Sequence, residues 1–130
     1  MKAERPQTLT GFTRKIKTGL GNVYITVNEL NNIPFEVFVS TGKCGQSIMA
    51  KAEVVGRLVS LALRANVPIN EIIAQLEGIA GEYPIPYKNS IILSIPDAVG
   101  KVLKEKYGEN KNERTLQSKE ENKIQKTHEK

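Results

Sequence analysis

The chain has 130 residues, of which 39% are hydrophobic, 25% charged and 5% aromatic, and its formal net charge is +5. This length fits one domain with a small core. A single cysteine, Cys44, and a single histidine, His128, exclude a disulfide scaffold, a cysteine-rich zinc module and a histidine-based triad. No stretch is typical of a secretory signal or a membrane span, so we expect a cytoplasmic protein that engages no membrane.

The positive charge belongs mainly to the first part of the chain. Residues 1–108 carry a net charge of +4 and residues 109–130 a net charge of +1. Residues 109–130 hold too few apolar side chains to offset the entropy of ordering them, so we expect a domain over 1–108 and a disordered or loosely helical tail. A basic domain favours anionic partners such as nucleotides, nucleic acid or acidic proteins, although many soluble basic domains have none.

Hydrophobic residues alternate with polar ones from residue 11 to residue 40. This period of two predicts three half-buried strands. The links at 18–21 and around 31–32 have turn chemistry and are short enough for hairpins. We therefore predict an antiparallel meander with one face on the core.

The period then changes to 3.6, which predicts helices. The first helix is expected from Ser47, as the N-cap, to Asn66, and it is apolar on two sides, so it must cover the sheet and also contact a second element or a second copy of the chain. A short helix is expected over 70–77 and ends at Gly78, a short strand over 91–93, and a third helix that begins at the capping box Ser94–Asp97. The predicted fold class is α+β, with a three- or four-stranded antiparallel meander packed against one long and two shorter helices.

Two motifs in this order resemble the TSCPD domain. They read KTGLGNVYITVN over residues 17–28 and GRLVSLALR over residues 56–64. Shorter matches flank them, and the resemblance covers roughly residues 5–105. TSCPD domains occur at the C-terminus of adenosylcobalamin-dependent ribonucleotide reductases and also as short stand-alone proteins.

The resemblance implies little chemistry for this chain. The cobalamin and thiol chemistry of the reductase lies in a part of that enzyme that has no counterpart here. The cysteines usual in the appended domain correspond to Leu20, Ser47, Gly81 or a neighbour, and Ile95. We therefore expect no zinc site, no dithiol relay and no cofactor. We also expect the protein not to be an enzyme, because nothing places Asp97 and Glu53 as a catalytic pair and Cys44 has no histidine in the domain to activate it.

A glycine-rich loop separates the third strand from the first helix. It contains Gly42, Lys43 and Gly45, but Val37 and Cys44 stand where a P-loop needs glycine and Ser or Thr. A phosphate is nevertheless favoured here, because the glycines let backbone N–H groups point outward, Lys43 is positively charged and the helix begins near Ser47. The alternative is a turn with a solvated lysine.

Four further cations extend this candidate site. Arg57 and Arg64 are seven residues apart on the first helix and suit a phosphate or carboxylate, or else pair with Glu53 or across a dimer interface. Lys15 and Lys17, with Arg14 and Tyr24, predict a basic sheet surface that suits single-stranded nucleic acid, or is merely solvated.

We accordingly predict a non-catalytic binding module for an anionic nucleotide or other small polyanion. Its predicted ligand-binding residues are Lys15, Lys17, Gly42, Lys43, Gly45, Ser47, Arg57 and Arg64. It is expected to form a homo-oligomer and to sequester a nucleotide, for example a cyclic signalling nucleotide. The alternatives are an accessory domain of ribonucleotide reductase and a binder of single-stranded nucleic acid.

Overall fold

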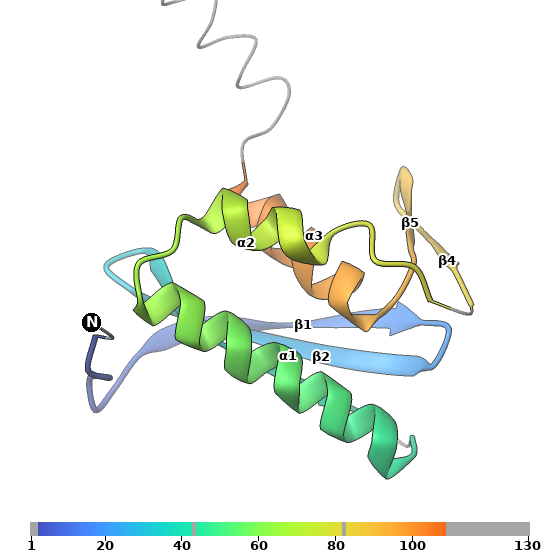
Figure 1. Cartoon of the computed structure of the whole chain (residues 1–130), viewed down its shortest axis with the longest axis horizontal. Coiled ribbons are helices and arrows are strands. Elements are labelled where there is room, and N and C mark those ends of the chain that lie inside the picture. Colours follow the sequence, from blue (N-terminus) through green and yellow to red (C-terminus); the bar gives the residue numbers. More distant parts are fainter. Residues whose placement is uncertain (1–2, 43, 82, 109–130) are drawn as a thin grey trace, which may run out of the picture.

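A computed structural model describes residues 3–42, 44–81 and 83–108 and has the predicted α+β architecture (Figure 1). Three strands, β1 (Thr10–Thr18), β2 (Gly21–Leu30) and β3 (Ile33–Thr41), form an antiparallel sheet in the order β1-β2-β3. Three helices follow: α1 (Gln46–Arg64), α2 (Ile69–Leu76) and α3 (Ile95–Tyr107). Between α2 and α3 a small hairpin pairs β4 (Ile85–Tyr87) with β5 (Ser90–Ile92).

The predicted meander is confirmed, and it has three strands. Asn31 and Asn32, which link β2 to β3, both have positive φ, as a two-residue hairpin turn requires. The short strand expected over 91–93 is found at 90–92, but it pairs with β4 in a separate hairpin and adds no fourth strand to the sheet.

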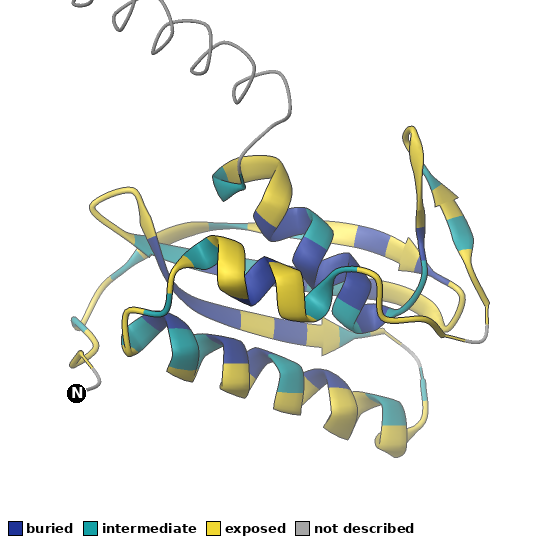
Figure 2. Ribbon diagram, turned by 45° about the horizontal axis from the view of Figure 1, so that its top comes forward, coloured by how far each residue is buried: buried dark blue, intermediate teal, exposed yellow. Residues whose placement is uncertain are grey.

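The core lies on one face of the sheet and is covered by α2 and α3, while α1 adds Ala52, Val59 and Leu63 to it (Figure 2). Its fully buried members on β2 are Val23, Ile25 and Val27, which are the inward residues of the predicted alternation. From α3 the core receives Ala98, Val99, Val102 and Leu103. The period-two pattern therefore predicted the buried face of β2 correctly.

Helix α1 lies along β3 and shields its outer edge. The Ser60 hydroxyl donates to the Val37 carbonyl oxygen and accepts from the Val37 N–H, both at 2.9 Å. Gly56 lies one turn earlier, and a Cβ added there would be 3.1 Å from the Val37 oxygen and 3.2 Å from the Val39 nitrogen. Small residues at this contact let the helix backbone approach the strand, and the Ser60 hydroxyl satisfies the backbone N–H and carbonyl groups of Val37. The edge of β3 is thereby protected against pairing with other chains.

The observed helix caps agree only in part with the prediction. Gly45 is the N-cap of α1, and Ser47 lies inside the first turn and makes no cap hydrogen bond, because Gly45 already has the extended backbone that a cap needs. At α3 the Ser94 hydroxyl accepts from the Asp97 N–H as predicted. The Asp97 carboxylate does not complete the box, since it accepts from Gly78 N and Leu93 N instead, both at 2.8 Å.

Helix α2 is shifted by one residue from the predicted 70–77. The left-handed backbone expected at Gly78, after its end, is present with φ at 91°. No helix among the described residues has the length and apolar character that crossing a bilayer would need.

Candidate functional site

A groove runs between α1 and β3 on the face of the sheet that the helices leave open. Its volume is about 1040 Å³, and we call it the α1–β3 groove. Its polar and charged lining comprises Arg5, Glu36, Ser40, Thr41, Gln46, Glu53, Arg57, Ser60 and Arg64. Its apolar lining includes Phe38, Met49 and Leu61.

Phe38 is the aromatic residue of the groove. It is 54% exposed, although it sits on a strand between the buried Val37 and Val39. Its alternation with these residues points its ring to the open face. Exposed Met49 and Leu61 line the same groove from α1. An exposed ring beside apolar walls is a surface on which a planar base can stack.

Arg57 is the most exposed cation of the groove lining. Its nearest acid is Glu53 one turn earlier, at 3.4 Å, and the two side chains are 79% and 65% exposed. Such an exposed pair contributes little stability and holds the guanidinium only loosely. The predicted pairing with Glu53 is therefore present, yet Arg57 stays accessible to a ligand.

Arg64 lies at the other end of the groove and is already engaged. Its Nε and Nη2 donate to the Ala3 carbonyl oxygen at 3.0 and 2.8 Å, and its guanidinium lies 5.3 Å from the centroid of the Phe35 ring. The N-terminal segment thus accepts the hydrogen bonds of Arg64 that we expected a ligand to accept.

Arg5 and Glu36 close this end with a second ion pair. Arg5 Nε lies 3.0 Å from both carboxylate oxygens of Glu36, and Asn28 donates to one of them at 2.9 Å. Burial alone would raise the pKa of Glu36, but these donors outweigh it and hold that pKa below its usual range. Glu36 is therefore ionised at neutral pH, and neither it nor Arg5 was among the predicted site residues.

The predicted loop lies at the opposite end of the groove from Arg64. Gly42 N donates to Asn22 O at 3.1 Å, and Gly45 caps α1, so both anchor the loop. Lys43, the predicted phosphate ligand, lies outside the described residues. Next to the loop, Thr41 Oγ1 is buried and has no hydrogen-bond partner in the part of the chain that the structure describes.

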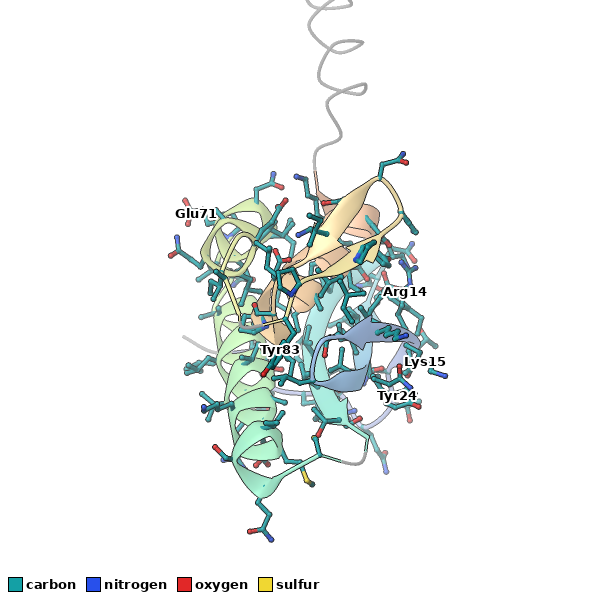
Figure 3. The ribbon with its side chains drawn as sticks, turned by 90° about the vertical axis from the view of Figure 1, so that its right-hand side faces the viewer. Arg14, Lys15, Tyr24, Glu71 and Tyr83 are labelled. Carbon is teal, nitrogen blue, oxygen red and sulfur yellow. The ribbon has the colours of Figure 1, made fainter. Side chains whose placement is uncertain are left out.

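Lys15 and Lys17 lie on β1, at the far side of the sheet from α1. Lys15 pairs with Tyr24 across the strands, and the two side chains project from the open face (Figure 3). Lys17 pairs with Asn22, whose carbonyl binds Gly42, so Lys17 and the loop share one end of the sheet. The lysines are thus near the loop but do not line the groove.

Arg14 does not belong to this basic surface, contrary to the prediction. It points to the core side with Phe12 and Ile16 and forms an ion pair with Glu105 of α3. The alternation of side chains along β1 separates it from Lys15 and Lys17, which follow the opposite parity.

The comparisons with known proteins decide the family. The profile of the TSCPD domain matches residues 1–107. The chain belongs to the TSCPD domain family. The family is associated with ribonucleotide reductase, as the resemblance in the sequence implied. No curated protein and no solved structure matches the sequence of this chain.

The single cysteine of the chain, Cys44, is partly exposed and free. The described residues contain no cluster of three or more His, Cys, Asp or Glu side chains that could hold a metal ion. Among the described residues, the α1–β3 groove combines the exposed aromatic ring of Phe38 with the exposed guanidinium of Arg57.

Proposed function

We propose that this TSCPD domain is a non-catalytic binding module for an anionic nucleotide, with the α1–β3 groove as its site. The observation that carries the proposal is the presence of an exposed aromatic ring, Phe38, and an exposed guanidinium, Arg57, in one groove. A base stacks on the ring, and a phosphate binds the guanidinium. The N-terminus of α1 adds positive potential at one end of the groove, and Lys17 lies at the same end of the sheet.

Binding without turnover makes the domain suited to sequestering a nucleotide, for instance a cyclic signalling nucleotide. The acidic groups of the groove are Glu36, which is locked to Arg5, and Glu53, which pairs with Arg57. Neither is arranged with a second acid or base for proton transfer. A nucleotide incubated with the protein is therefore expected to be recovered chemically unchanged after release.

Substitutions in the groove test the binding proposal. Phe38→Ala and Arg57→Gln are each expected to weaken nucleotide binding about tenfold or more, since a base stack or a charge-assisted hydrogen bond contributes roughly 1–3 kcal/mol. Thermal shift against AMP, ATP and cyclic di-AMP identifies a ligand, and calorimetry measures its dissociation constant.

Two matched variants serve as controls. Ile33→Ala removes another exposed apolar side chain from β3, and Lys51→Gln removes another exposed cation from α1. Both lie outside the groove lining and should bind the nucleotide as the unmodified chain does. Equal losses in all four variants, or no nucleotide response at all, would refute the proposal.

We also propose that α1 joins two copies of the chain. Val54 and Leu58 are 53% and 60% exposed on this helix, and neither lines the α1–β3 groove. In an antiparallel pairing of two α1 helices these side chains would pack against their counterparts in the other copy and leave the groove lining outside the contact.

A charge placed in this surface tests the dimer. Leu58→Glu is expected to convert a dimer to a monomer in light scattering after size-exclusion chromatography. Ile91→Glu alters another exposed apolar residue, on β5, and should leave the mass unchanged. A monomeric unmodified chain would contradict this part of the proposal.

The family association favours a second candidate, an accessory role on ribonucleotide reductase. Co-purification with a reductase that lacks its own C-terminal TSCPD module supports this candidate. For the Lys15–Tyr24 surface, steeply salt-dependent retention on single-stranded DNA would indicate nucleic-acid binding instead.

A further inference from the structure

The N-terminal residues 3–6 form a strap across the Arg64 end of the α1–β3 groove. Ala3 N donates to the Arg64 carbonyl oxygen at 2.9 Å, and the Ala3 carbonyl oxygen accepts two hydrogen bonds from the Arg64 guanidinium. Arg5 locks the strap to the sheet through Glu36, with 2.8 Å between Arg5 Nη2 and the carboxylate. The strap is therefore attached to α1 by Ala3 and to β3 by Arg5.

The Ala3 carbonyl oxygen occupies the position of a ligand oxygen on Arg64. Two N–H groups of one guanidinium converge on it at 2.8 and 3.0 Å, as they would on a phosphate oxygen. A carbonyl oxygen is neutral, and a phosphate oxygen is charged and accepts a stronger hydrogen bond from the same donors. An anion that reached Arg64 would therefore compete with the strap.

Arg57 and Arg64 set the size of such a ligand. Both line the groove, and seven residues of α-helix place their Cα atoms about 10 Å apart along the axis. A mononucleotide carries phosphate at one point and so suits one of the two arginines. A ligand with two separated phosphate groups suits both.

We propose that Arg64 is a second phosphate subsite, that the strap masks it, and that a nucleotide with two separated phosphates displaces the strap whereas a mononucleotide does not. The inference rests on the proposed nucleotide site and names its ligand class. Loosening the strap removes the competitor for Arg64 and leaves Arg57 untouched. It should therefore favour the larger ligand selectively.

The test compares AMP with the linear dinucleotide pApA on full-length variants. Ala3→Pro removes the N–H that binds Arg64 O and changes no charge. It is expected to raise the affinity for pApA about fivefold and to leave that for AMP within a factor of two. Gln7→Ala, which keeps the strap contacts, should change neither, and adding Arg64→Gln should abolish the gain.

An independent readout follows the strap directly. In nitrogen-15 NMR spectra of the unmodified chain, pApA should shift the Arg64 Nε–H signal, and AMP should not. If both nucleotides bind but Ala3→Pro leaves the pApA to AMP ratio unchanged, the strap inference alone is overturned. If neither nucleotide binds, the proposed function fails as well.

Discussion

Replacing Asp97 with alanine is expected to lower the free energy of unfolding by about 3 kcal/mol. Asp97 is fully buried at the start of α3, and its carboxylate accepts hydrogen bonds from Gly78 N and Leu93 N and pairs with Lys101. It therefore joins the end of α2, the end of the β4–β5 hairpin and α3. Alanine would leave two backbone donors and one ammonium group without their acceptor.

Chemical denaturation followed by circular dichroism measures the change. Lys101→Met removes the ion pair but keeps both backbone donors satisfied, so its effect should be about 1 kcal/mol. A similarly small loss in Asp97→Ala would show that water or neighbouring groups replace the carboxylate. In that case Asp97 would not be the link between the three elements.

The contribution of Asp97 should also depend on pH. Burial would raise the pKa of Asp97, but the N–H groups of Gly78 and Leu93 and the Lys101 ammonium outweigh it and lower that pKa below its usual value near 3.9. The stabilisation is therefore complete above about pH 4 and is lost as the pH falls through the lower, folded-state pKa. Asp97→Asn should accordingly differ most from the unmodified chain at neutral pH, and the difference should shrink below pH 4.

A Gly56→Leu substitution is expected to cost about 3 kcal/mol and to disturb the α1–β3 groove. Even a Cβ at this position would lie 3.1 Å from Val37 O, 3.2 Å from Val39 N and 3.6 Å from Phe38 Cα. These are backbone atoms of a paired strand, so they cannot rotate away as a side chain can. The helix must move outward, and the hydrogen bonds between Ser60 and Val37 must lengthen.

Val54→Leu is the matched control, because it enlarges an exposed side chain of the same helix. It should change the free energy of unfolding by less than about 0.5 kcal/mol. Gly56→Ala should fall between the two, since alanine favours the helix by up to about 1 kcal/mol while its Cβ meets the strand. Full stability in Gly56→Leu would show that α1 can shift along β3 without loss.

Much of the fold could be predicted because its signals are local. The alternation through Val23, Ile25 and Val27 selected the buried face of β2, and Asn31-Asn32 marked the turn to β3. Ser94 was identified as a cap because its partner, the Asp97 N–H, is only three residues away. Each signal involves neighbours in the sequence, where the spacing alone fixes the geometry.

The candidate site was harder to predict because it depends on distant contacts. Arg64 was recognised as a cation, but nothing near it in the sequence revealed that Ala3 takes its hydrogen bonds. Ser60 read as a polar residue between two arginines, yet its hydroxyl is used by the edge of β3. The strand pattern showed Phe38 on the polar side, which was a signal for an exposed ring that the prediction did not use.

The sequence by itself determined the family, the antiparallel meander and the order of the helices, because motif spacing and hydrophobic period are properties of contiguous residues. Only the tertiary structure decided that α1 lies beside β3, that a groove opens there under Arg57, and that the N-terminal strap closes its far end on Arg64. These features depend on how closely two backbones approach and on which donor meets which acceptor across 31 or 61 residues of chain. No local pattern encodes such pairings, because each is selected by the packing of the whole domain.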